Sequence, residues 1–363
     1  MSDSISLYFN DVLVNPTLPS YMSENEYIAS NLHTQDFSVA LIGIPDKNNS
    51  ANTVRNHLYT LFGNFTTIKL RDLGNLKKGK SEKEMALALE HVVQELAEKS
   101  IPCIVFGGEQ WLTTAIFKGI TEVQPNVGVC FIDSKIDVGD MQESSCSHSF
   151  ITQLATHHTL DNIDIVGAQQ YYYTERQRQY IREHKGDITR LSEARKDIFK
   201  LEPTLRNADL ISIDMSAVRL SDAPAAKFPC PNGFTGEEVC QLTRFAGYAD
   251  KTKALVISAW DCINDHQHHT SRLVAETIWH FLDGVDKREQ ESPNEDNPIY
   301  TKLVVQSDIH DDGIIFYHNT QTDRWWIEIP TLSGLRIYPC HTNDYQALCN
   351  NEIPAIWLRY LYK

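Results

Sequence analysis

The stretch that decides the fold runs from residue 101 to residue 110 and reads Ile-Pro-Cys-Ile-Val-Phe-Gly-Gly-Glu-Gln. Its first six residues form an apolar run of strand length, and Gly107-Gly108-Glu109-Gln110 follows where that strand would end. Two later apolar runs, 127–132 and 210–213, are followed by Asp133-Ser134-Lys135-Ile136-Asp137 and by Asp214-Met215-Ser216. Polar residues directly after buried strands indicate functional groups at the carboxyl edge of a parallel sheet.

Short apolar runs alternate with amphipathic helical patterns along most of the chain. One helix is well marked at Glu82–Lys99, where Ser81 and Glu84 form a capping box before an apolar stripe. The predicted strands are 39–45, 66–70, 101–106, 127–132, 163–166, 210–213 and 254–257, and the predicted helices are 52–62, 82–99, 111–120, 150–157, 173–184, 235–248 and 270–282. This alternation predicts an α/β fold in which helices cover both faces of one parallel sheet, as three layers in the order α/β/α.

The pattern changes after residue 285. The charged segment 286–297 is predicted to be a surface loop. Three short alternating runs at 302–306, 313–318 and 324–329 predict antiparallel strands, and 356–362 predicts a final helix. We therefore predict an α/β domain over residues 1–285 and a C-terminal extension over residues 286–363 that packs on the same domain.

Composition narrows the functional classes. The net charge of −15 and the lack of a strong Lys/Arg cluster argue against nucleic acid as a partner. No apolar run reaches the ~20 residues that cross a bilayer, so no membrane partner is predicted. The eight cysteines contain no C-x-x-C pair, which favours a reducing cytoplasm. The aromatic runs Tyr171–Tyr173 and Trp325-Trp326 are assigned to core packing or, alternatively, to contacts in a homo-oligomer.

The three motifs, together with Asp72-Leu73-Gly74-Asn75 and Asn232–Glu238, resemble the arginase (ureohydrolase) superfamily. The resemblance covers roughly residues 37–285 and is strongest to formimidoylglutamase-type chains. It implies an arginase-like three-layer fold. It also implies two Mn²⁺ ions about 3.5–4 Å apart, which activate a water molecule to hydrolyse a guanidino or formimino carbon.

Carried over position by position, the resemblance places several of the family's metal ligands where this chain has other residues. Gln110 and Lys135 stand where the family has histidine ligands, and Ser216 stands where it has a carboxylate. The family's acidic residue that contacts the substrate would fall near Ala259. The substrate-binding residues are therefore left open.

Three retained carboxylates, Asp133, Asp137 and Asp214, form one metal site at most. Clustered carboxylates repel one another unless a cation lies among them. The Lys135 ammonium is a compact cation on a flexible stem, so we interpret it as an attached substitute for the second metal ion. The predicted cofactor is none or one divalent ion, Mn²⁺, and an intact dinuclear Mn²⁺ centre is not predicted.

One histidine is a candidate for proton transfer. His148 lies in the segment 144–150, which matches imperfectly the loop that carries a histidine proton shuttle in the family. The alternative assignment is a polar loop histidine at the start of a helix.

Three functions are compatible with the sequence. The leading interpretation is a ureohydrolase-family protein that hydrolyses a C–N bond of a linear amidine, N-formimidoyl-L-glutamate, to glutamate and formamide, with activity impaired by the replaced ligands. The first alternative is a non-catalytic pseudo-enzyme, a binding or scaffold protein that keeps the pocket for a small amino-acid-like ligand or a partner chain. The second is a single-metal hydrolase of another C–N bond, with His148 or Lys135 in proton transfer.

Overall fold

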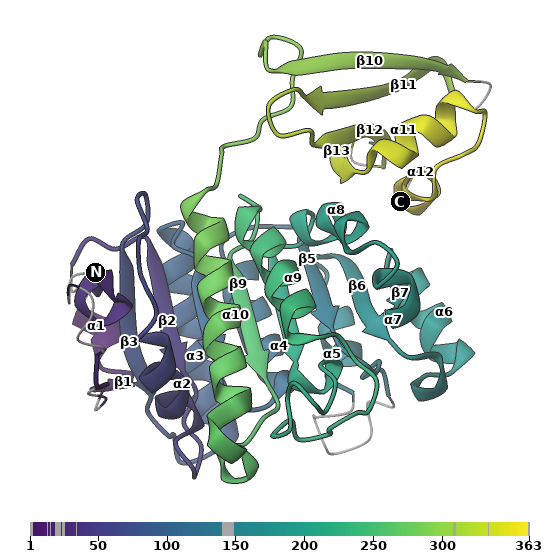
Figure 1. Ribbon diagram of the computed structural model, residues 1–363. Coiled ribbons are helices and arrows are strands. Elements are labelled where there is room, and N and C mark those ends of the chain that lie inside the picture. The colour runs from purple at the N-terminus through teal and green to yellow at the C-terminus, as the bar shows by residue number, and fades with distance from the viewer. Residues whose placement is uncertain are drawn as a thin grey trace.

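The computed structural model describes residues 3–12, 14, 16–18, 23, 26–33, 35–139, 149–307, 310–332 and 334–361. Within these residues a nine-stranded sheet is covered by helices on both faces, and a four-stranded antiparallel sheet follows it (Figure 1). The order of the large sheet is β1-β3-β2-β4-β9-β8-β5-β6-β7. β1 runs antiparallel to β3, whereas the other neighbouring pairs are parallel.

The strands are β1 (Phe9–Asn10), β2 (Val39–Gly43), β3 (Leu70–Leu76), β4 (Cys103–Phe106), β5 (Val127–Ile132), β6 (Leu160–Ala168), β7 (Asp187–Arg190), β8 (Leu210–Asp214), β9 (Ala254–Ser258), β10 (Tyr300–Ser307), β11 (His310–Asn319), β12 (Trp325–Thr331) and β13 (Gly334–Cys340). The α-helices are α1 (Asp3–Ser6), α2 (Ser50–Leu58), α3 (Glu82–Glu98), α4 (Thr113–Thr121), α5 (Phe150–Ala155), α6 (Glu175–Glu183), α7 (Leu191–Ala194), α8 (Glu202–Arg206), α9 (Gly236–Tyr248), α10 (His269–Asp286), α11 (Thr342–Cys349) and α12 (Ala355–Tyr360). Short 3-10 turns lie between several of them.

Two apolar cores cover the two faces of the large sheet. On one face α2, α9 and α10 pack against the strands, with Val54 and Phe281 fully buried. On the other face α3, α4 and α5 do so, with Leu89 and Ile116 fully buried. Because the central strands are buried on both faces, they appear in the sequence as continuous apolar runs. The predicted three-layer α/β/α fold with a parallel sheet is confirmed.

One strand begins later than its sequence pattern predicts. The run 66–70 was expected to be a strand, but β3 starts at Leu70. The backbone N–H groups of Thr66, Thr67 and Ile68 donate to Oδ1 of Asp286 at 2.8, 2.6 and 3.1 Å, so they are not available to a strand partner. A contact 218–220 residues away along the chain thus overrides the local β propensity.

The C-terminal sheet has the order β10-β11-β12-β13, and α11 and α12 pack on one of its faces. The sequence predicted β10, β11, β12 and α12, but it missed β13 and α11. β13 contains Pro339, which cannot donate to a ladder and which weakens a strand pattern. Because β13 pairs only with β12 in the described sheet, the proline is tolerated at its edge.

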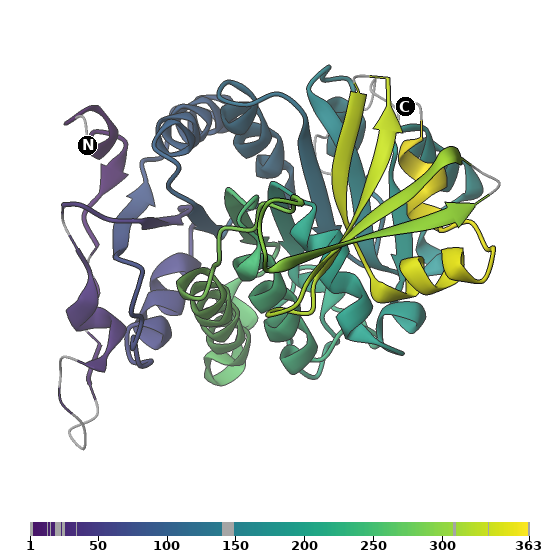
Figure 2. The same ribbon diagram turned by 90° about the horizontal axis from the view of Figure 1, so that it is seen from above.

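The C-terminal sheet contacts the large sheet near the amino-terminal half of β6. Arg336 forms an ion pair with Asp161 at 3.0 Å, and Arg359 pairs with Asp164 at 2.7 Å. The Arg206 guanidinium lies 4.4 Å from the ring centre of Trp326. Figures 1 and 2 show the sheet above one end of the α/β layers, over β5–β7. The carboxyl ends of the parallel strands lie at the opposite end.

The division of the chain after residue 285 stays a prediction, although it falls next to the end of α10 at Asp286. Among the described helices, none combines the length and the apolar character needed to span a bilayer.

Candidate functional site

Three turns meet at the carboxyl edge of the large sheet. β4 is followed by Gly107–Gln110, β5 by Asp133–Asp137, and β8 ends at Asp214. β5 and β8 are neighbours, and β9 alone separates β8 from β4. Parallel strands bring their carboxyl ends to one edge, so the structure gathers the motifs that the sequence singled out.

The turn after β4 requires its two glycines. Gly107 and Gly108 have φ angles of +103° and +71°, a region that side chains disfavour. A Cβ atom at Gly107 would lie 2.9 Å from the carbonyl oxygen of Ile44, and one at Gly108 would lie 2.7 Å from Ile44 Cγ2. The chain can therefore turn tightly against β2 and carry Glu109 and Gln110 into the site.

Gln110 is buried and poorly hydrogen-bonded. The residue is 5% exposed, and neither Oε1 nor Nε2 forms a hydrogen bond of ordinary geometry within the described part of the chain. A weak hydrogen bond from the amide N–H to Asp133 lowers the pKa of that carboxyl, which leaves Oε1 as the atom without a partner. Leaving a buried polar group unpaired costs about 1–3 kcal/mol. Such a cost points to a group that the amide is placed to bind.

Asp133 and Asp214 are held in matching ways. Oδ1 of Asp133 accepts from the N–H of Lys135 at 2.9 Å, and Oδ1 of Asp214 accepts from the N–H of Ser216 at 2.6 Å. Their residues are 4% and 8% exposed. The side chains of Gln110 and Ser216 make weaker hydrogen bonds to Asp133 and Asp214, respectively, and lower the pKa of these carboxyls. Each carboxylate is thus anchored by one short backbone hydrogen bond and has no ion pair among the described residues.

The three retained aspartates share an environment that favours protonation. Burial, then the charges of Asp214 and Asp137, raises the pKa of Asp133 well above its usual value. Burial and the charge of Asp214 raise the pKa of Asp137 to about 7. Burial also raises the pKa of Asp214 to about 6, although hydrogen bonds from Ser216 oppose that rise. The carboxylates are thus near one another and short of positive charge.

Lys135 lies at the rim of this acidic cluster. Its Nζ is 4.4 Å from the ring centre of Phe228 and 5.8 Å from that of Tyr172. Among the described residues it forms no ion pair within 4.0 Å, yet its charge lowers the pKa of Asp137 and of Asp214. The ammonium therefore acts on the carboxylates through space, and its direct contacts are aromatic faces.

Ser216 lies in the buried floor of the site. It is 2% exposed, and its Oγ is 3.4 Å from Oγ of Ser134, which is fully buried. A hydroxyl that is already shared with a second serine is a weak substitute for a carboxylate ligand.

The structure adds residues that the motif analysis missed. Lys227 forms an ion pair with Glu109, and the next residue, Phe228, covers Lys135. Both lie in the irregular loop after β8. A lysine next to an aromatic residue in this loop is a weak sequence signal. The spacing of residues in an irregular loop does not predict which strand end the loop will reach.

Ala259 follows β9 and occupies the position where the family resemblance expects a carboxylate. It is 3% exposed and has a φ of +67°. Its N–H donates to the carbonyl of Gly108 at 3.0 Å, and its carbonyl accepts from the N–H of Lys227 at 2.8 Å. The nearby Asp261 instead binds Asn48 Nδ2 at 2.8 Å and so is engaged elsewhere.

The side chains at this edge do not fit the family's dinuclear manganese centre. Three of the positions that the family resemblance assigns to metal ligands hold an amide, an ammonium and a hydroxyl, of which the ammonium repels a second cation. No group of three or more His, Cys, Asp or Glu side chains in the described ranges is arranged to hold a metal ion. We therefore derive no step through bound metal.

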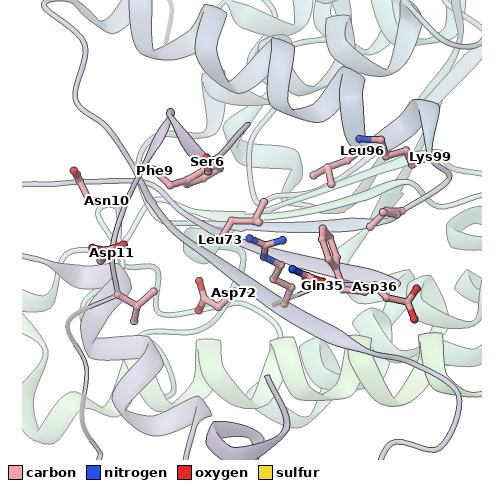
Figure 3. Close-up of a pocket in the computed structure, with 14 residues that line it drawn as sticks. Ser6, Phe9, Asn10, Asp11, Gln35, Asp36, Asp72, Leu73, Leu96 and Lys99 are labelled. Carbon is pink, nitrogen blue, oxygen red and sulfur yellow. The ribbon is translucent and has the colours of Figure 1, made fainter. Parts of the chain in front are cut away.

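Two other candidates stand apart from this cluster. His148 lies outside the described residues, so its predicted role is not placed. A cavity of about 610 Å³ lies at the β1–β3 side of the sheet, lined in part by Phe37, Arg71 and Lys99 (Figure 3). None of the carboxylates described above lines it. It contributes nothing to the acidic cluster.

Comparison with known protein families identifies the family of this chain. The model of the arginase family matches residues 45–283, well over half of the sequence, and the chain belongs to the arginase family. Curated relatives include formimidoylglutamases of Staphylococcus aureus strains N315 and Mu50. Each is 25% identical over 200 residues, which cover 52% of this chain and 64% of the relative. The match thus spans less than two-thirds of those relatives' own length.

Solved structures show the same fold. Trypanosoma cruzi formiminoglutamase with Mn²⁺ aligns with a TM-score of 0.67 at 20% identity, covering 72% of this chain and 99% of that one. Formimidoylglutamase from Bacillus subtilis subsp. subtilis str. 168 aligns with a TM-score of 0.66 at 16% identity, covering 76% and 97%. The predicted arginase-like fold is confirmed, as is the resemblance to formimidoylglutamase-type proteins.

Proposed function

We propose that this chain has the pocket of a formimidoylglutamase-type amidine hydrolase and that its replaced ligand positions impair the hydrolysis. The reaction in question converts N-formimidoyl-L-glutamate and water to glutamate and formamide. Family membership and the similarity to formimidoylglutamases support the substrate class. The retention of Asp133, Asp137 and Asp214 at one strand edge supports the use of the same pocket.

The proposal of impaired hydrolysis rests on the side chains of Gln110, Lys135 and Ser216. Water becomes a sufficient nucleophile for an amidine carbon at neutral pH when two metal ions deprotonate it and hold it in place. An amide and a hydroxyl are poor ligands for such ions, and an ammonium opposes their charge. The remaining residues still bind and orient, because the carboxylates of Asp133 and Asp214 accept N–H donors from a ligand.

A second function, that of a non-catalytic binding protein, is favoured by the rim of the site. Phe228 and Tyr172 are 50% and 39% exposed although they lie over the Lys135 ammonium. A charged group flanked by exposed aromatic faces suits recognition of an amino-acid-like ligand. This function needs the pocket but no turnover.

The test combines metal content with product release. The purified chain is equilibrated with excess Mn²⁺, desalted and analysed by plasma mass spectrometry, and formamide release from N-formimidoyl-L-glutamate is then measured. We expect fewer than two ions per chain and little or no formamide. The matched variant Gln110→His/Lys135→His/Ser216→Asp, which restores the three ligand positions, is expected to bind more Mn²⁺ than the wild type.

The possible outcomes separate the functions. Two ions per chain with rapid Mn²⁺-dependent release of formamide contradicts the impairment. One ion with turnover that Asp137→Asn abolishes supports the single-metal hydrolase. Little metal and no formamide, combined with saturable ligand binding, supports the binding protein.

A further inference from the structure

The acidic cluster is rich in acceptor oxygens. Gln110 is buried, its N–H group makes only a weak hydrogen bond to Asp133, and its Oε1 has no partner among the described residues. Asp133 and Asp214 each accept one short backbone hydrogen bond from their own turn, and neither forms an ion pair with a described residue. Three acceptor groups from three strand ends therefore face one small region.

The cluster also lacks a direct counter-ion. Lys135, whose charge acts on Asp137 and Asp214, makes no ion pair within 4.0 Å in the part of the chain that the structure describes. Lys227 is occupied by Glu109. A bound cation would therefore satisfy both the charge and the hydrogen-bond acceptors.

The arrangement of the acidic side chains favours an organic cation over a metal ion. Metal ions need several ligands converging at about 2.0–2.6 Å, and the described side chains form no such group. A planar amidinium or guanidinium instead carries N–H donors on separate nitrogens, each making a charge-assisted hydrogen bond of about 2.7–2.9 Å. Its acceptors can therefore stand further apart, on different strands.

We propose that Asp133, Asp214 and Gln110 bind an amidinium or guanidinium group directly, without a metal ion, where other family members have their metal site. Entry is from the side of Glu109, Lys135 and Asp137, which are only partly buried. The ligand class is a small cation with at least two N–H donors. The inference rests on the proposed function only in placing the ligand in the same pocket.

Lys135 sets a further condition on the ligand. Its ammonium stands at the rim, on the exposed rings of Phe228 and Tyr172. It repels a bare cation weakly and attracts a carboxylate. A ligand with an amidinium at one end and a carboxylate at the other therefore fits the site better than an amidinium alone.

The test is isothermal titration calorimetry of the full chain in EDTA. The probe is acetamidinium chloride, and tetramethylammonium chloride at equal ionic strength serves as a cation of the same charge without N–H donors. We expect one saturable site for acetamidinium and none for tetramethylammonium. Gln110→Leu and Asp214→Asn should each weaken binding at least about tenfold.

The controls keep the result interpretable. Gln179→Leu makes the same change on the exposed face of α6 and is expected to bind as the wild type does. Gln110→Met, which keeps the length of the side chain, replaces Gln110→Leu if that variant melts early. Lys135→Met should strengthen acetamidinium binding and weaken binding of N-formimidoyl-L-glutamate, a split that general loss of structure does not produce.

Three results overturn the inference: no acetamidinium binding in EDTA, equal binding of tetramethylammonium, or wild-type affinity in both site variants. The proposed function is judged separately by formamide release. Fast Mn²⁺-dependent turnover contradicts the impairment without bearing on metal-free binding. Absent acetamidinium binding contradicts this inference alone.

Discussion

One buried carboxylate, Asp72 of β3, and the acidic cluster at the carboxyl edge of the sheet differ in how their charge is balanced. Asp72 receives both Nε and Nη2 of Arg55, at 2.7 and 2.9 Å, and the hydroxyl of Tyr59 at 2.8 Å. Arg55 is fully buried and lies 5.0 Å from the ring centre of Phe106, the last residue of β4. Asp133 and Asp214, by contrast, have no ion pair among the described residues.

The difference separates structural charge from functional charge. A buried carboxylate that is paired in a two-pronged geometry holds elements together, here α2 and β3 under the turn after β4. A buried carboxylate without a cation costs free energy unless a ligand supplies one. The first arrangement is complete in the chain itself, whereas the second is complete only with a bound partner.

The largest expected effect comes from breaking the paired cluster. Arg55→Met leaves Asp72 buried and uncompensated, so the free energy of unfolding should fall by about 3–5 kcal/mol. Urea denaturation followed by circular dichroism measures it. Arg195→Met, which removes a half-exposed partner of Glu238, is the control and should cost less than about 1 kcal/mol. Equal losses of unfolding free energy in Arg55→Met and Arg195→Met would contradict the view that the buried ion pair matters more than the exposed one.

Removing a charge from the unpaired cluster should instead raise the free energy of unfolding. Asp214→Asn removes a desolvated charge but keeps an oxygen for the Ser216 N–H, so at pH 8 the ligand-free protein should gain about 1–2 kcal/mol. The same urea titration measures the gain. A clear loss of stability would mean that Asp214 is balanced by a cation within the chain.

A third carboxylate sharpens the comparison, because hydrogen bonds hold it without any cation. Asp286 accepts from the N–H groups of Thr66, Thr67 and Ile68, and these bonds lower its pKa despite burial, which acts against them. Asp286→Asn should therefore cost about 1 kcal/mol at pH 7.

The pH dependence of that cost has a definite sign. A lowered pKa in the folded state stabilises the protein above the unfolded value of about 3.9, and the benefit is lost as the pH falls through the folded value. The gap between wild type and Asp286→Asn should thus narrow in urea titrations as the pH is lowered from 5, and it should vanish only below the folded pKa. A constant gap over that range would show that the carboxylate charge is not involved.

The smallest expected effect is at Lys135. If its ammonium substituted for a metal ion in direct contact with the carboxylates, Lys135→Met would cost about 3–5 kcal/mol. Its contacts with Phe228 and Tyr172 at the rim instead predict a loss below about 1 kcal/mol. Thermal unfolding of the two proteins side by side distinguishes these values.

The candidate site could be predicted from sequence only in part. Asp133, Asp137, Asp214 and Gln110 were found because each follows an apolar run, and strand ends in a parallel sheet share an edge. Lys227 and Phe228 were not found, since they belong to a loop with no periodicity. The late start of β3 was also hidden, because the competing hydrogen bonds come from Asp286 at the end of α10.

The sequence by itself determined the layers, the parallel sheet and the place of the site, because hydrophobic periodicity and strand-end residues are local signals. Only the tertiary structure decided which charges are balanced. The orientation of Lys135 toward aromatic rings, the unpaired amide oxygen of Gln110 and the pairing of Glu109 with Lys227 all depend on distances between segments far apart in the chain. Electrostatic energies depend on those distances and on the local burial, and neither can be predicted from the order of the residues alone.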